Sequence, residues 1–315
     1  MRELVLGGDI GGTRSRLAIA EVESGMPRSR RVHIYANDDF SDFNSLLRRF
    51  LQEEPMGLSV VRVCLGLAGP QEGGAVQLTN RDWTIRTAEV ESLFPHAKVQ
   101  LVNDFETAAY GIDLLASDDL LTLQAGQPMA QAPQLVIGAG TGLGVAYRLW
   151  IGNSYRVLAG EGGHASFAPI DEQQLKIWRA IYDAEGRVSD EMLISGAGIA
   201  RIFSILSRER ISPPEVSRRA MEKNDPTAKQ TLEIFARCYG AVAGDHALAI
   251  LARGGVFMAG GVAPRIHEFL QASRLLEAFN AKGHHTPVAQ RMPVHVVLNE
   301  QLGLLGATLL AARGE

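Results

Sequence analysis

Residues 4–22 read LVLGGDIGGTRSRLAIAEV, and this stretch decides the fold. A short apolar run at residues 4–6 leads into a glycine-rich segment at 7–13, and residues 17–22 are apolar again. A strand, a glycine turn and a second strand in this order predict a β-hairpin. The same order occurs again at residues 134–150, where a second glycine-rich segment separates two apolar runs. Two such hairpins in one chain indicate a duplicated half-fold.

Around the two hairpins, apolar strands and periodic helices alternate along the chain. We expect further strands at residues 31–35, 60–67, 99–102, 255–258 and 294–298. We expect helices at residues 43–51 with Ser41 as N-cap, at 105–115, from Asp225-Pro226 to about 251, and at 303–312. This mixed order predicts an α/β protein rather than a helix bundle or a β-sandwich.

The composition excludes several classes of protein. The chain has 315 residues, 46% hydrophobic and 21% charged, which suits a globular protein with one large domain or two domains. The formal net charge is −4 and no basic stripe occurs, so we expect no nucleic-acid partner. No run of about 18 apolar residues occurs, so we expect no membrane partner. The first residues lack a signal-peptide pattern, and the only two cysteines, Cys64 and Cys238, resemble buried apolar residues. Together these features predict a cytoplasmic protein.

The two glycine turns have features that are typical of phosphate-binding loops. Glycine lets the backbone approach a ligand closely, and successive N–H groups in a turn form an anion-binding concavity. Residues 9–13 and 138–142 both fit this need, and each turn adds a threonine hydroxyl. Asp9 would repel phosphate but would suit a hydrated magnesium ion beside it. Neither segment matches the dinucleotide fingerprint or the P-loop, and a single such hairpin is usually only a tight turn.

A third glycine cluster, at residues 254–262, ends a predicted strand with Gly260-Gly261. Such a strand end would let a flat ligand such as adenine approach the backbone. Taken alone, this cluster is better explained by a simple strand-to-helix turn.

Two groups of polar side chains are candidates for binding or catalysis. Asn103 and Asp104 follow an apolar strand, and residues at strand ends of α/β folds face the ligand crevice, so Asp104 is a candidate base. The alternative is that Asp104 only caps the following helix. Glu161 and His164 flank two glycines, and a carboxylate with an imidazole suits the hydroxyls of a sugar, although a surface turn is equally consistent.

Taken together, these sequence segments resemble those of the bacterial glucokinase family, within the sugar kinase, heat-shock chaperone and actin superfamily. The similar segments occur in the family's order over nearly the whole chain. They are residues 8–13 with 16–18, Leu67-Ala68-Gly69-Pro70, Leu78-Thr79-Asn80 with Trp83, and residues 102–105, 138–145, 160–164, 167–169, 189–191, 195–196, 257–261, 264–265 and 303–306.

The resemblance implies ATP-dependent phosphorylation of D-glucose at its 6-hydroxyl, with Mg²⁺. It implies that Asp104 is the catalytic base and also contacts the sugar. The other implied sugar ligands are Asn103, Glu161, His164 and Glu191. The implied phosphate and metal-water contacts are Asp9, Gly11, Gly12, Thr13, Gly138, Ala139, Gly140 and Thr141. Gly260 and Gly261 would form the adenosine motif. No side chain would bind the metal directly, although Asp9 would reach it through water.

The resemblance also implies the actin-like ATPase fold, which is ribonuclease H-like, with two α/β domains that close over an interdomain cleft. The small domain would comprise residues 1–110 and 300–315, and the large domain residues 111–299. A homodimer is expected from the family. Arg14-Ser15 and Ala165-Ser166 depart from the family pattern, and the lack of a cysteine-rich zinc motif favours the non-zinc branch.

Two alternatives stay open at this stage. One is a kinase for another hexose or an amino sugar, because single hydroxyl contacts decide between isomers. The other is a sugar-binding regulator, or a catalytically silent protein, on the same fold. The strand beginning at Leu4 and the acidic net charge argue against a DNA-binding regulator.

Overall fold

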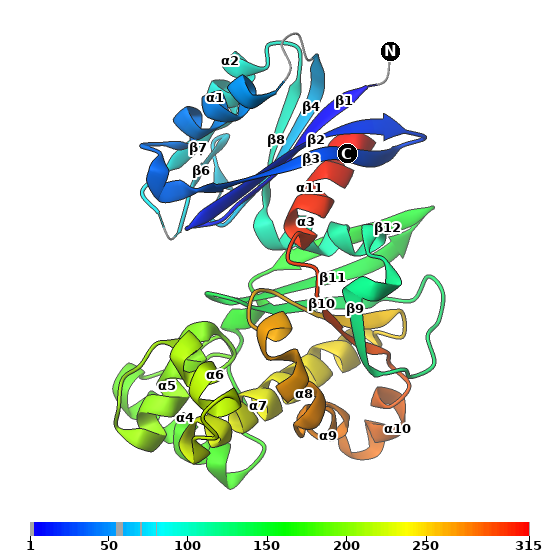
Figure 1. The fold of residues 1–315 in the computed structure, drawn as a ribbon. Helices are drawn as coiled ribbons and strands as arrows, with labels where there is room; N and C mark the ends of the chain where they lie inside the picture. Colours follow the sequence, from blue (N-terminus) through cyan, green and yellow to red (C-terminus); the bar gives the residue numbers. More distant parts are fainter. Residues whose placement is uncertain (1–2, 55–58, 70, 80, 315) are drawn as a thin grey trace. The chain divides into compact units, whose positions relative to one another are not determined.

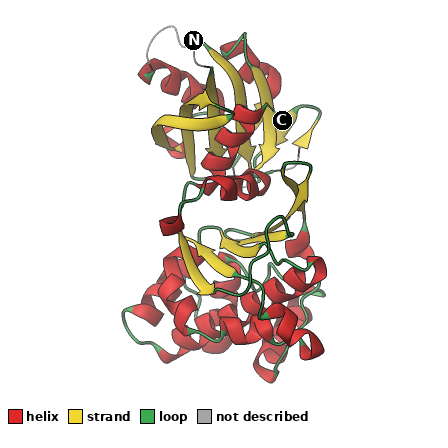
Figure 2. Cartoon of the chain, turned by 90° about the vertical axis from the view of Figure 1, so that its right-hand side faces the viewer, coloured by secondary structure: helices red, strands yellow, loops and turns green. Residues whose placement is uncertain are grey.

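The computed structural model describes residues 3–54, 59–69, 71–79 and 81–314, and the chain divides into two compact units. One unit comprises Met1–Leu115 with Gln301–Glu315, and the other comprises Ala116–Glu300. Figure 1 shows the elements of each unit in sequence colours, and Figure 2 shows that each unit combines a sheet with helices. The expected mixture of strands and helices is therefore confirmed.

The first unit contains a five-stranded sheet in the order β3-β2-β1-β4-β8. Its strands are β1 (Leu4–Ile10), β2 (Arg14–Glu23), β3 (Met26–Ala36), β4 (Val60–Leu67) and β8 (Lys98–Asn103). Strand β1 pairs antiparallel with β2, as the hairpin pattern predicts, and parallel with β4. A smaller sheet contains β5 (Gln71–Glu72), β6 (Ala75–Gln77) and β7 (Thr84–Arg86).

The helices of this unit are α1 (Phe43–Glu53), α2 (Thr87–Leu93), α3 (Asp104–Gly111) and α11 (Leu302–Arg313), with 3₁₀ turns η1 (Asn37–Asp39) and η2 (Ile112–Leu114). Because side chains alternate across a strand, β1 contributes residues to the packing on both faces of the sheet. Leu6 faces the cluster that includes α1, whereas a Cβ on Gly7 would lie 2.2 Å from Thr308 Oγ1 of α11. Helix α11 therefore packs directly on the β1 backbone.

Two local expectations for this unit were wrong. Strand β1 continues through Gly7 and Gly8 to Ile10, so the turn is shorter than the glycine run suggested. The N-cap of α1 is Asp42 rather than Ser41, because the Asp42 carboxylate accepts a hydrogen bond from the Ser45 N–H and completes a capping box.

The second unit contains a six-stranded sheet in the order β12-β11-β10-β13-β14-β9. The strands are β9 (Leu120–Gln124), β10 (Gln134–Ala139), β11 (Leu143–Ile151), β12 (Ser154–Gly160), β13 (Gly255–Ala259) and β14 (Val294–Val297). Strands β10 and β11 form the second predicted hairpin, and β10 pairs parallel with β13. The sequence reading did not identify β9 or β12.

The helices of this unit are α4 (Glu172–Glu185), α5 (Gly196–Ser207), α6 (Pro213–Met221), α7 (Pro226–Ile250), α8 (His267–Ala272), α9 (Leu275–Asn280) and α10 (Thr286–Ala289). Short 3₁₀ segments are η3 (Ser117–Asp119), η4 (Gly162–His164), η5 (Ala263–Ile266) and η6 (Gly283–His285). As predicted, α7 begins at Pro226 with Asp225 as its cap. The buried Tyr239 hydroxyl donates to Ile137 O at 2.9 Å and thereby ties α7 to β10. Among the helices of the described chain, none is both long enough and apolar enough to cross a membrane.

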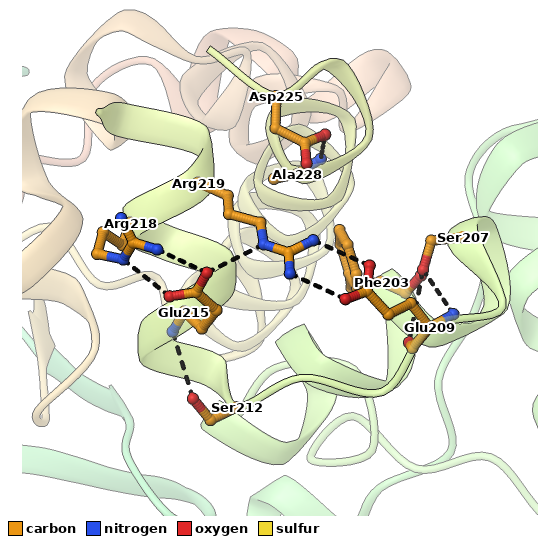
Figure 3. A network of polar contacts seen from close by, with 9 residues as sticks. All are labelled: Phe203, Ser207, Glu209, Ser212, Glu215, Arg218, Arg219, Asp225 and Ala228. Atoms are coloured by element: carbon orange, nitrogen blue, oxygen red, sulfur yellow. Dashed lines mark hydrogen bonds and ion pairs between the residues drawn. The ribbon is translucent and has the colours of Figure 1, made fainter. Parts of the chain in front are cut away.

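An ion-pair network joins the segment after α5 to α6 (Figure 3). Arg219 donates both Nη atoms to Glu209, at 2.8 and 2.9 Å, and its Nε to Glu215 at 3.0 Å. Arg218 donates Nε and Nη2 to Glu215 at 2.8 and 2.7 Å. Hydrogen bonds from Arg218 and then Arg219 lower the pKa of Glu215 to about 2, from an ordinary value of 4.5.

We therefore predict a pH-dependent loss of stability in Glu215→Gln. Because the folded state lowers the pKa of Glu215, the ionised carboxylate stabilises the fold above about pH 4.5, and this stabilisation is lost as the pH falls towards about 2. The melting temperature of the variant should be below that of the native chain from about pH 5 to 8, and the two should converge towards pH 2. Thermal unfolding followed by circular dichroism measures this, with the exposed Glu172→Gln as control. A difference that stayed constant down to pH 2 would contradict the prediction.

Candidate functional site

Asp9 lies on the face of β1 that α11 covers. A Cβ on Gly303, in the first turn of α11, would be 3.1 Å from the Asp9 Cγ. Arg16 Nη1 donates to Asp9 Oδ2 at 3.2 Å. Burial raises the pKa of the Asp9 carboxyl, and the Arg16 guanidinium opposes that rise. Among the described residues, no group of three or more histidine, cysteine, aspartate or glutamate side chains could hold a metal ion. A single carboxylate fits a magnesium ion that keeps most of its water.

The first glycine turn is confined to three residues between β1 and β2. The Gly11 N–H donates to Arg14 O at 3.0 Å and closes the hairpin. Gly11 and Gly12 are half-buried, whereas Thr13 and Arg14 are exposed. The turn backbone is therefore accessible at its tip, as direct contact with a phosphate requires.

Asn103 and Asp104 lie where β8 passes directly into α3. Asn103 is the N-cap, because its Oδ1 accepts hydrogen bonds from the Phe105 and Glu106 N–H groups at 2.9 and 3.1 Å. Capping by Asp104, the simpler alternative at the sequence level, is therefore wrong. Asp104 is the first residue of α3 and is half-buried, and the Asn103 side chain is exposed.

Close glycine contacts fix the position of α3. A Cβ on Gly306 of α11 would lie 1.6 Å from Thr107 O, and a Cβ on Gly111 would lie 2.2 Å from Leu302 O. The two helix backbones are thus in direct contact at both glycines. This contact places the start of α3, and with it Asp104, relative to the sheet.

The second glycine turn is held by backbone groups from two other segments. Ala139 O accepts a hydrogen bond from Val262 N at 3.0 Å, and Gly140 O accepts one from Gly196 N at 2.8 Å. Gly260 has a φ of +83°, and a Cβ there would lie 2.4 Å from Ala139 O. The structure therefore brings residues 138–141 together with Gly260-Gly261, and Gly260 must be glycine.

The three predicted sugar ligands of the second unit gather at the start of β11. Glu191 Oε2 accepts from Leu143 N at 2.9 Å, and the Glu191 N–H donates to Gly163 O at 2.9 Å. His164 Nε2 lies 3.8 Å from Glu161 Oε2, and their side chains are 59% and 86% exposed. The exposed Glu161 and His164, with the half-buried Glu191, could bind sugar hydroxyls.

Two further charged residues lie beside this set, and the sequence pattern gave neither of them a role. Arg187 Nη2 donates to His164 O at 2.7 Å and braces η4. Burial, with a contribution from the charge of Asp245, raises the pKa of the Asp190 carboxyl to about 7. Asp190 lies in the family-like segment 189–191, but its raised pKa depends on burial and on Asp245, and the Arg187 contact also forms only in the fold.

Two residues of the family-like segments are not described in the structure. Pro70 and Asn80 lie outside the described residues. Trp83 is buried, and its Nε1 donates to Ser41 O at 3.0 Å.

Comparison with known proteins shows which family the chain matches. A family model described as Glucokinase matches residues 6–314. The glucokinase of Trichormus variabilis is 35% identical, over 98% of this chain and 99% of its own length. The crystal structure of glucokinase from an Antarctic psychrotroph matches with a TM-score of 0.88 at 30% identity, over 99% of both chains. A ROK family glucokinase from Streptomyces griseus, solved with glucose and AMPPNP, matches at TM-score 0.64 over 99% of this chain and 100% of its own. At 22% identity, that last likeness shows the fold alone.

The glycine contact between α3 and α11 yields a stability prediction. In Gly306→Ala the new methyl group would overlap Thr107 O, so the two helices must move apart. Overpacking of this kind should lower the free energy of unfolding by about 2–3 kcal/mol. Urea unfolding followed by circular dichroism measures the change. A variant as stable as the native chain would show that the helices are not in contact at this glycine.

Proposed function

The chain belongs to the glucokinase family, and from that premise we propose how its residues carry out the transfer of a phosphoryl group from ATP to the 6-hydroxyl of glucose. The family model spans residues 6–314, and full-length relatives are glucokinases. The reaction assigned to this chain is therefore that of glucokinase, EC 2.7.1.2. The residue roles that follow are our proposal.

Asp104 is the proposed catalytic base. The observation that supports this role best is that Asn103, rather than Asp104, caps α3. The N-cap that begins α3 is therefore Asn103, and Asp104 follows it as the first residue of the helix. Because the transition state of phosphoryl transfer is loose, the base need only orient the 6-hydroxyl and accept its proton late in the reaction.

Asn103, Glu161, His164 and Glu191 are the proposed sugar ligands. Glu161 and His164 lie within 3.8 Å of each other, and Glu191 is bonded to Gly163 between them in sequence. Charged groups form stronger hydrogen bonds to hydroxyls than neutral groups do, so such a set would orient the ring firmly. The Asn103 Nδ2 is not used in capping, which suits it to a sugar oxygen.

The two glycine turns are the proposed phosphate contacts, through Gly11, Gly12 and Thr13 and through residues 138–141. Gly260 and Gly261 are the proposed adenosine contacts. Asp9 would hold Mg²⁺ through water, and the ion would neutralise phosphate charge during transfer. The Asp9 carboxylate is already oriented by Arg16 at 3.2 Å.

The remaining expectations for the chain stay predictions. We propose a cytoplasmic location, which the two free and buried cysteines, Cys64 and Cys238, support. The homodimer also stays a prediction, and sedimentation of the purified protein would test it.

Replacing Asp104 tests the proposed base. In Asp104→Ala, kcat for ADP release from MgATP and glucose should fall by about 10²–10⁴-fold, because general-base catalysis contributes about that much. KM for glucose should change only a few-fold, since Glu161, His164 and Glu191 remain. Asp118→Ala removes an exposed carboxylate outside the proposed site and serves as the matched control. A kcat for Asp104→Ala within tenfold of the native value would exclude Asp104 as the base.

A further inference from the structure

The carbonyl groups of the first glycine turn are all bound from outside the turn. Gly11 O accepts from Asn37 Nδ2 at 2.8 Å, and Gly12 O accepts from Arg81 Nη1 at 3.4 Å. Thr13 O accepts from Asn37 N at 2.9 Å. Three successive carbonyls are therefore held by only two residues.

This arrangement determines where the N–H groups of the turn point. In a trans peptide the C=O and the following N–H point in opposite directions, and the described chain has no cis peptide bond. Holding Gly11 O and Gly12 O on the side of Asn37 and Arg81 therefore directs the Gly12 and Thr13 N–H groups to the opposite side. Two adjacent N–H groups on one side of a turn form an anion-binding concavity.

The Asn37 side chain is itself fixed in one orientation. Asn37 is fully buried, and its Oδ1 accepts from Ser15 Oγ at 2.8 Å. Gly11 O can only accept a hydrogen bond, so the amide nitrogen must face it and the amide oxygen must face Ser15.

Arg81 is oriented just as firmly, by groups on separate segments. Its Nη2 donates to Asn37 O at 2.6 Å, and its Nη1 lies 2.7 Å from Asp38 Oδ1. The guanidinium lies over the Trp83 ring, 4.3 Å from the centroid. The planar guanidinium group binds Gly12, Asn37 and Asp38 at the same time. The ammonium group of a lysine cannot reproduce this geometry.

We propose that Asn37 and Arg81 are positioning residues for ATP. They hold the carbonyls of the turn so that the Gly12 and Thr13 N–H groups are already directed at a phosphate before ATP binds. This inference rests on the proposed function, because it assumes that this turn binds the phosphates of ATP. It adds two side chains that do not touch the nucleotide but determine how well the turn receives it.

The test compares Asn37→Ala, Arg81→Ala and Arg81→Lys with the native enzyme. Losing one such hydrogen bond should weaken phosphate binding by about tenfold. KM for ATP, and the dissociation constant for MgADP measured by calorimetry, should therefore both rise about tenfold in Asn37→Ala and Arg81→Ala. KM for glucose at saturating ATP should stay within about twofold. Arg86→Ala, which removes an exposed arginine paired with Glu89 at 3.5 Å, is the matched control.

Arg81→Lys separates positioning from simple charge. Lysine keeps the positive charge but loses the planar guanidinium group, so its MgADP affinity should stay close to that of Arg81→Ala. Native affinity in Arg81→Lys would mean that Arg81 acts only by charge, and native affinity in Asn37→Ala would overturn the role of Asn37. Equal losses for ATP and glucose would indicate a general structural role and would also overturn the proposal. If the native enzyme itself neither bound MgADP nor turned over, the proposed function would fail first, and this inference with it.

Discussion

In a trans peptide the N–H group points away from the preceding carbonyl, so an N–H group of a turn faces a ligand only if that carbonyl is held on the opposite side. This constraint applies to both glycine turns. In the second unit, the backbone amide Gly196 N binds Gly140 O and so directs the Thr141 N–H away from it, whereas the Gly140 N–H donates to Gly142 O within the turn. In the first unit, the side chains of Asn37 and Arg81 bind Gly11 O and Gly12 O. The two hairpins therefore both hold a turn carbonyl from outside, the first with side chains and the second with a backbone amide.

The segments that hold the second turn also carry the other proposed site residues. Val262 directly follows Gly260-Gly261, so the proposed adenosine contacts and the turn cannot move independently. Gly196 starts α5, and Ser195 just before it donates its Oγ to Glu191 O at 2.8 Å. Glu191 in turn accepts from Leu143 N, at the end of the turn. One set of hydrogen bonds thus positions the groups proposed for adenosine, phosphate and sugar within this unit.

The sequence was most informative where structure depends on local pattern. The two hairpins, β4 and the start of α7 at Asp225-Pro226 were predicted, because their signals lie within a few residues. The extent of β1 was not, because Gly7 pairs in the sheet with Ala18 and Cys64, and the Thr308 that it contacts is 301 positions away in the chain. Asn37 and Arg81 were missed for the same reason, since their partners in the turn lie 24 or more residues away. The roles of Asn103 and Glu191 came from family resemblance and not from their own surroundings.

The most direct measurement of the central claim is ADP release from ATP and Mg²⁺ across glucose, mannose, fructose, N-acetylglucosamine and N-acetylmannosamine, ranked by kcat/KM. A pocket built to bind particular hydroxyls discriminates strongly against sugars that leave its polar groups unpaired. The account predicts that glucose leads the panel by more than about tenfold, since one poorly placed hydrogen bond costs about that factor. Another sugar in first place, or no turnover with any of the five, would contradict it.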